Sequence, residues 1–302
     1  MTPQILVDGL ISGMLIGLGA IGVTLTYSIL RFANFAHGEF ISVGAYAALL
    51  IASGVSALVV GSGEGIGNVS ISFALIVAAP LAMALTGLFA LALDKVLFSR
   101  LRGRSASISL VMASFGASMA IRASLEFAFT SRPAYFSRDL QIARPLGFGL
   151  KATPDQLALA VFALVLLVAV HLLLTRTQIG RAMRAVSENP SLARVAGVDV
   201  DATIRFVWAL GGALAAASGV MLGLIVQIRP FMGFDLLLPL FAAAILGGIG
   251  SAPGAFAGAL IVGLGEAATV HFAGAEWRAA VAFVMLIAVL LIKPTGLAGR
   301  PV

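Results

Sequence analysis

The sequence predicts an all-α protein, a polytopic bundle of transmembrane helices, and three observations support this fold class. Sixty per cent of the 302 residues are apolar and only 11% are charged, whereas about a quarter of the residues of soluble domains are charged. The mean hydropathy is +1.08. The apolar residues gather in runs of about 20, the length that a helix needs to cross a bilayer. This composition excludes an ordinary soluble enzyme, a disordered chain and a fibrous protein.

Nine apolar segments follow one another along the chain, and each is expected to be a helix. Backbone polar groups in lipid must be satisfied within their own segment, which excludes isolated strands. In order, the segments are 5–30, 36–60, 70–93, 106–130, 156–174, 203–228, 235–250, 255–272 and 277–292. The run at 235–250 is short for a span and could form a re-entrant pair with 255–272. We therefore expect eight or nine elements, some broken or re-entrant, in one transmembrane domain over residues 1–302.

The basic residues predict how these segments are oriented. Twelve Lys and Arg fall in loops on one side, six fall on the other, and Arg122 lies inside a segment. The twelve are Arg31, Lys95, Arg100, Arg102, Arg104, Arg176, Arg181, Arg184, Arg194, Arg205, Lys293 and Arg300. The positive-inside rule makes their side cytoplasmic, so the N-terminus is expected outside and the C-terminus inside. The first ten residues carry no Lys or Arg, so the first segment is expected to be a retained helix rather than a signal peptide.

A polar interruption, Asn34-Phe35-Ala36-His37-Gly38-Glu39, separates the first two segments. Three polar side chains around Gly38 are costly at membrane depth unless they line water or satisfy one another. One interpretation is a broken helix whose polar ends face a translocation pathway. The alternative is a polar loop at the membrane surface, in which Asn34 caps the next helix.

A second interruption is rich in glycine and spans 246–254. Gly247, Gly248, Gly250 and Pro253 are suited to ending one helix and starting another. The stretch lacks the Gly-Lys-Ser/Thr ending of a phosphate-binding loop, so this chain is not expected to bind a nucleotide. A faint likeness of 37–50 to 253–266 would fit an inverted repeat, in which both breaks surround or gate a pathway.

Other residues suggest packing rather than chemistry. Small residues recur at every fourth position, either for packing within the bundle or at a subunit interface; they are Gly9, Gly13, Gly17, Gly211, Ala215, Gly219, Gly223, Gly254 and Gly258. Arg122 and Glu126 lie one turn apart and are expected to pair. Glu266 and His271 are expected to reach headgroups. The three histidines have no ligand spacing, and the chain has no cysteine, so a metal site is not supported.

A polar stretch at 175–201 separates the fifth and sixth segments and is expected to be cytoplasmic. Asn189 and Pro190 read as an N-cap and a first helical residue, and Gly197 reads as a left-handed stop. The resulting helix, 190–196, is too short to be stable alone. Its Leu192, Val195 and Ala196 form an apolar ridge suited to a partner's groove. The alternative is a helix that rests on lipid headgroups.

Five motifs in this order resemble one known family. They are "NFAHGEF" followed by "GAY" (34–40 and 44–46), "IGRAMRAVSENPSLARVAGVDVD" (179–201), "GGALAAASGVMLG" (211–223), "FAAAILGGIGSAPGAFAG" (241–258) and "KPTGLAGRP" (293–301). They are similar to the Liv-type permeases of branched-chain amino-acid ABC importers, of the shorter of two permease types. The resemblance implies an inner-membrane pump with two permease chains, the second of the longer type, two cytoplasmic ATP-binding subunits and a periplasmic substrate-binding protein. It implies no nucleic acid and no cofactor of this chain's own, because the partner subunits bind ATP.

The resemblance and the residues together give two candidate sites. The pathway or gating residues are Asn34, His37, Gly38, Glu39, Gly247, Gly248 and Gly250. The ATPase-coupling residues are Glu188, Asn189, Pro190, Leu192, Ala193, Val195, Ala196 and Gly197, and the resemblance favours their docking into an ATPase groove.

Two other function classes are alternatives to this one. An ion-coupled secondary transporter of amino acids would share the glycine breaks and would need buried carboxylates, for which Glu39 and Glu266 are candidates. A membrane enzyme would need a nucleophile, base or metal set, and none is visible in the sequence. The family often carries a lysine where this chain has 236–239, so the solute is expected to be an amino acid or a related small polar molecule such as an amide or urea.

Overall fold

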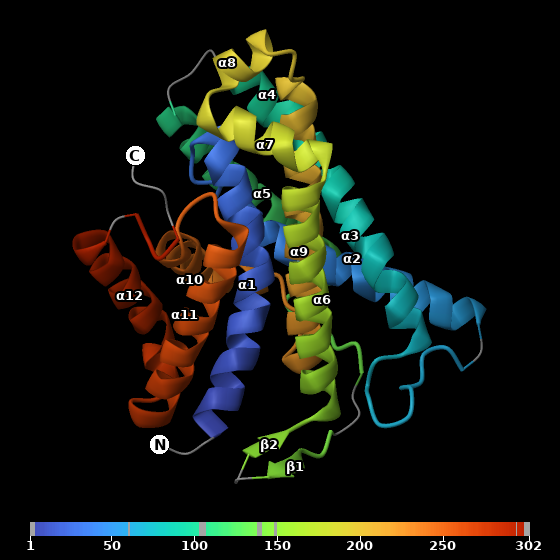
Figure 1. Cartoon of the computed structure of the whole chain (residues 1–302). Coiled ribbons are helices and arrows are strands. Elements are labelled where there is room, and N and C mark those ends of the chain that lie inside the picture. Colours follow the sequence, from blue (N-terminus) through green and yellow to red (C-terminus); the bar gives the residue numbers. More distant parts are fainter. Residues whose placement is uncertain are drawn as a thin grey trace.

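The fold described here is that of a computed structural model, which describes residues 4–59, 61–102, 107–137, 141–147, 150–293 and 295–298. It is a bundle of helices with one small hairpin (Figure 1). The elements are α1 (Gln4–Leu30), α2 (Ala36–Leu58), α3 (Phe73–Leu93), a π-helical turn (Asp94–Phe98), α4 (Ser99–Leu101), α5 (Ser107–Phe129), β1 (Arg144–Gly147), β2 (Leu150–Ala152), α6 (Pro154–Arg176), α7 (Gln178–Glu188), α8 (Pro190–Val195), α9 (Val200–Ile225), α10 (Met232–Gly247), α11 (Ala252–Phe272), a 3-10 turn (Ala275–Trp277) and α12 (Arg278–Ile292).

Eight helical stretches in the described residues are long and apolar enough to cross a membrane. The short segment predicted at 235–250 is α10, with 16 residues. This confirms the predicted polytopic bundle of eight or nine elements. The third span is longer than its apolar run, because the π-helical turn carries it on to Leu101. The remaining interval, 131–153, contains the two-stranded antiparallel hairpin β1–β2, which the sequence did not predict.

Glycine stripes let the central helices approach closely. A Cβ at Gly13 would lie 2.7 Å from the Leu260 Cα of α11, and a Cβ at Gly17 would lie 2.6 Å from the Phe256 ring. On α9, a Cβ at Gly211 would lie 3.2 Å from the Thr26 Cγ2 of α1. These small residues therefore pack helices within one chain, and of the two interpretations offered for them the intramolecular one is confirmed at these positions.

The bundle has two distinct ends (Figure 1). The short helices α4, α7 and α8 lie at one end, and the start of α1 and the hairpin lie at the other. Gln4 ties the hairpin to α1 because its side chain accepts from the Lys151 N–H and donates to the Lys151 carbonyl, both at 3.0 Å. The basic side chains of 176–184 share the end that carries α8. Three of the basic residues counted for the predicted orientation lie outside the described residues; they are Arg104, Arg138 and Arg300. Part of the "KPTGLAGRP" motif lies outside them too.

Candidate functional site

The first turn of α2 forms a buried polar centre inside the bundle. Asn34 is 4% exposed, and its side-chain oxygen accepts from the Ala36 N–H at 3.1 Å, so it does help to start the helix. His37 and Glu39 are fully buried. The His37 Nε2 lies 3.2 Å from the Gly19 carbonyl oxygen of α1, and Gly22 leaves the room for its ring. Of the two interpretations offered, a polar break within the bundle fits this burial and a surface loop does not.

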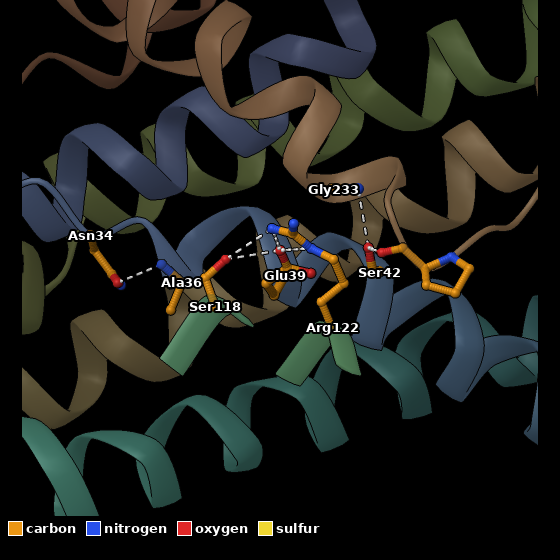
Figure 2. Close-up of polar contacts among 8 residues, drawn as sticks. Asn34, Ala36, Glu39, Ser42, Ser118, Arg122 and Gly233 are labelled. Atoms are coloured by element: carbon orange, nitrogen blue, oxygen red, sulfur yellow. Dashed lines mark hydrogen bonds and ion pairs between the residues drawn. The ribbon is translucent and has the colours of Figure 1, made fainter. Parts of the chain in front are cut away.

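A carboxylate and an arginine meet at this centre. The Glu39 Oε1 accepts from the Arg122 Nη2 at 2.7 Å, from the Arg122 Nε at 3.1 Å and from the Ser118 hydroxyl at 2.9 Å (Figure 2). Ser118 and Arg122 come from one face of α5. The expected pair of Arg122 with Glu126 is therefore wrong, because α2 brings a better-buried carboxylate to the arginine, while Glu126 accepts from the Ser131 hydroxyl.

The start of α10 is locked onto the same turns of α2. The Ser42 hydroxyl accepts from the Gly233 N–H at 3.0 Å and donates to the Pro230 carbonyl at 3.1 Å (Figure 2). Gly38 faces Gly233 across the joint, where a Cβ at 38 would lie 2.6 Å from the Gly233 carbonyl oxygen. Glycine is needed at positions 38 and 233 because the backbones of α2 and α10 are in contact there.

Aromatic rings complete the surroundings of Arg122. Its guanidinium carbon lies 4.0 Å from the ring centroid of Phe234 and 4.9 Å from that of Phe231. Phe234 lies in the first turn of α10, and Phe231 is the residue directly before the helix. Such cation–π contacts stabilise an arginine where little water reaches it. Sequence reasoning missed Ser118, Phe231 and Phe234; the i, i+4 spacing of a serine and an arginine on α5 was the available signal.

The glycine-rich break lies at the opposite end of α10, about 21 Å along the helix from Gly233 at 1.5 Å per residue. Gly248 and Gly250 have φ of +97° and +90°, and the Gly250 N–H donates to the Thr24 hydroxyl at 2.8 Å. Gly247 packs on α11, where a Cβ would lie 2.5 Å from the Ala255 Cα. Residues 297 and 298 donate to the Leu246 and Gly247 carbonyls. The structure thus does not bring the two predicted gating sets together; α10 connects them.

The predicted helix of the 175–201 stretch is present as α8. Asn189 caps it by accepting from the Leu192 N–H at 3.0 Å, Pro190 opens it, and Gly197 ends it at a φ of +84°. Leu192 and Val195 are 65% and 86% exposed. Ala193, with 4% exposure, faces the core instead. Ala196 is exposed just beyond the last helical residue, and Glu188 ends α7 before the cap.

The α7–α8 pair is tied to the chain segment that leads into the polar centre. The Arg31 Nη2 donates to the Ser187 carbonyl at 2.5 Å, one residue before the end of α7. Arg31 itself has a positive φ of 57°, at the point where α1 ends and the chain turns toward Asn34. One hydrogen bond thus joins the end of α7 to the residue at which the chain leaves α1.

The structure also places the other ionisable residues that the sequence singled out, Glu266, His171 and His271. Glu266 is 1% exposed and accepts from the Arg278 Nε at 2.7 Å, which corrects the expectation that it reaches headgroups. Both carboxylates considered for ion coupling, Glu39 and Glu266, thus carry an arginine partner. His171 and His271 are exposed, and no group of three His, Cys, Asp or Glu able to hold a metal occurs among the described residues.

A cavity of about 500 Å³ opens at the end of the bundle that carries the hairpin. Its lining joins the start of α6 and the end of α9 to the loop before α3 and to the stretch between α5 and β1, and includes Ser70, Tyr135, Gln141, Asp155 and Gln156. Asp155 accepts from the Ser70 N–H at 2.7 Å. The sequence did not predict this cavity, because its walls come from four separate segments.

Known proteins with similar sequences match almost the whole chain. The model of the family described as "Branched-chain amino acid transport system / permease component" matches residues 5–290. The high-affinity branched-chain amino acid transport system permease protein LivH of Escherichia coli (strain K12) is 31% identical over 305 positions, covering 99% of this chain and 96% of LivH. The corresponding protein BraD of Pseudomonas aeruginosa is 31% identical with the same coverage. A probable LivH of Methanocaldococcus jannaschii is 30% identical, covering 98% of this chain and 92% of its own length.

Proposed function

The chain belongs to the family of branched-chain amino acid transport permease components, and from this premise we propose that it forms the translocation pathway of an ATP-driven importer. The proposed solutes are branched-chain amino acids or related small polar molecules, including amides and urea. The observation that carries the proposal is an exposed apolar ridge on α8, formed by Leu192 and Val195, together with a buried polar break at the start of α2. Arg31, which precedes that break, is hydrogen-bonded to Ser187 in the last turn of α7, just before α8.

The geometry supports a route from an ATPase to the pathway. Leu192 and Val195 offer an apolar ridge at the end of the bundle that carries the basic loops. A helix of six residues has no stable existence in water, so a groove on a partner would stabilise it. Movement of α8 with α7 would pull on Arg31 and thereby on Asn34 and α2. The stretch 175–201 would thus be the coupling loop of the single domain 1–302.

The family membership implies ATPase and substrate-binding-protein partners. In the proposed assembly there are two cytoplasmic ATP-binding subunits, a periplasmic binding protein and a second permease of the longer type. The chain itself carries out no chemical step; ATP hydrolysis takes place on the partners. The paired state of Glu39 and Glu266 argues against the ion-coupled alternative, because a carboxylate bound to arginine is poorly placed to carry a coupling proton.

The proposed function predicts that uptake by the reconstituted complex requires ATP inside and binding protein outside. With both present, radiolabelled leucine, isoleucine or valine should accumulate at least about tenfold above a complex with an ATPase-dead subunit, since a dead subunit removes the energy source. Amides and urea complete the solute panel. Accumulation without ATP that collapses when an ionophore dissipates an ion gradient would contradict the proposal and favour a secondary transporter.

We further propose that the N-terminus is outside and that α7 and α8 are cytoplasmic. Because the chain has no cysteine, single cysteines report accessibility without background. A cysteine replacing Arg100 should react with a membrane-impermeant maleimide only in inside-out vesicles, and one replacing Gln141 only in intact cells or right-side-out vesicles, because the two positions lie at opposite ends of the bundle. The reverse pattern would overturn the orientation.

A further inference from the structure

The ion pair with Glu39 does not use all the hydrogen-bond donors of the Arg122 guanidinium. Its Nε and Nη2 donate to Glu39, and Nη2 also contacts Ser118, but Nη1 makes no hydrogen bond to the described residues. The Glu39 Oε2 likewise has no partner among them. Within the described residues the Nη1 edge of the guanidinium therefore remains open to an anionic group, whereas the Glu39 Oε2 is buried behind it.

The aromatic rings that pack on Arg122 are partly exposed, so its guanidinium is not sealed inside the bundle. Phe231 is 44% exposed and Phe234 is 38% exposed, and the Arg122 side chain is 13% exposed between them. The two rings and the partly exposed guanidinium thus lie together on one exposed face, with the buried Glu39 behind them. An apolar side chain could lie on the rings while an anionic group meets the guanidinium.

The same face carries charges that lipid would not tolerate well. Arg229 and Asp235, on either side of the two phenylalanines, pair at 2.9 Å and are about half exposed. Arg122 lies seven residues before the end of α5 at Phe129, about 10 Å along the helix axis. A charge that is partly exposed at that depth, as Arg122 is, normally faces a water-filled cavity or another protein segment rather than hydrocarbon. This face is thus the side of the bundle on which a polar solute could pass.

We propose that Arg122, framed by Phe231 and Phe234, is a solute-binding residue that receives the carboxylate of a small apolar amino acid. The two rings receive its hydrocarbon side chain, and Glu39 holds the guanidinium in place. The inference rests on the proposed function for the kind of solute that it names. It separates amino acids from amides and urea, because only the former carry the carboxylate that a guanidinium pairs with at two points.

The test is the protection of a single cysteine by solute. Met119 lies one turn before Arg122 on α5 and is 57% exposed; Met112, a heptad earlier on the same face, is 64% exposed. Met119→Cys and Met112→Cys are made in the complex of permeases and ATPases, without binding protein, in nanodiscs. Mixed-disulfide formation with a water-soluble methanethiosulfonate, which releases methanesulfinate, is timed with no solute, with about 20 mM leucine or with about 20 mM leucinamide, a concentration chosen to fill a site of millimolar Kd.

We expect leucine to slow the reaction at Met119→Cys about fivefold, leucinamide to leave it nearly unchanged, and Met112→Cys to be unaffected by either solute. Arg122→Gln should abolish the protection and Arg122→Lys should keep part of it. Arg278→Gln, which breaks the ion pair to Glu266, should keep all of it. A merely structural role for Arg122 would not depend on the solute's carboxylate.

Four results would overturn the inference: no reaction at Met119→Cys, which would place this face in lipid; no protection by leucine; equal protection by leucinamide; or protection that survives Arg122→Gln in a complex of normal size and yield. The measurement is independent of ATP-driven uptake, so failure here with normal transport would reject the solute site alone. Failure of transport with intact protection would instead reject the importer.

Discussion

Replacing Leu192 by aspartate is expected to abolish transport while the chain still enters the membrane. Leu192 is 65% exposed on α8, so the substitution removes nothing from the core of this chain. In the proposed complex the side chain would be buried in a groove of an ATPase, where an unpaired carboxylate is costly. A central interface residue of this kind contributes about 2 kcal/mol or more, which is a factor of about 30 in affinity. The ATPase subunits should therefore be lost during purification of the complex, and solute uptake should fall at least tenfold.

Ser191→Asp is the matched control, because it places the same charge on the neighbouring exposed residue, outside the apolar ridge and near the helix N-terminus, where a negative charge is favourable. It should co-purify and transport like the unmodified chain. Normal recovery of the ATPases together with normal uptake for Leu192→Asp would show that α8 is not the docking element.

The second large effect is expected at the joint between α2 and α10. Any side chain at position 38 would place its Cβ 2.6 Å from the Gly233 carbonyl oxygen and 2.7 Å from the Leu237 Cγ. A carbonyl oxygen cannot rotate away as a side chain can, so α10 must move. Gly38→Val should lower the stability of the folded chain by about 1–3 kcal/mol and displace Gly233 from its hydrogen bond to Ser42. We expect uptake to fall below a tenth of normal, with a lowered melting temperature in detergent.

Gly116→Val is the control for this prediction. Gly116 lies inside α5, and nothing lies within 4 Å of the position that its Cβ would occupy. The same substitution there tests the cost of valine in a membrane helix without the clash, and it should leave both uptake and melting temperature nearly unchanged. Equal behaviour of the two variants would mean that the joint tolerates expansion and does not hold α10 in register.

The candidate site was predictable where its residues are neighbours in the sequence. Asn34, His37 and Glu39 were identified because three polar groups in one short stretch cannot be left unpaired in lipid. The cap and the stop of α8 were predicted for a similar reason, since Asn189, Pro190 and Gly197 act on backbone groups within a few residues. The partners of these groups were not predicted. Arg122 was assigned to Glu126, one turn away, but pairs with Glu39, 83 residues away.

The sequence by itself determined the membrane location, a set of eight or nine helical segments, the broken starts of α2 and α11, and the short helix α8. These follow from hydrophobic burial and from local hydrogen bonding, which act over one helix length or less. Only the tertiary structure decided that the α5 arginine neutralises the α2 carboxylate, that Phe231 and Phe234 frame it, and that the two glycine breaks lie at opposite ends of α10. The physical reason is that every membrane helix is apolar on most sides, so hydropathy does not specify which faces meet. That choice depends on close approach at residues such as Gly38 and Gly233 and on the pairing of a few buried charges.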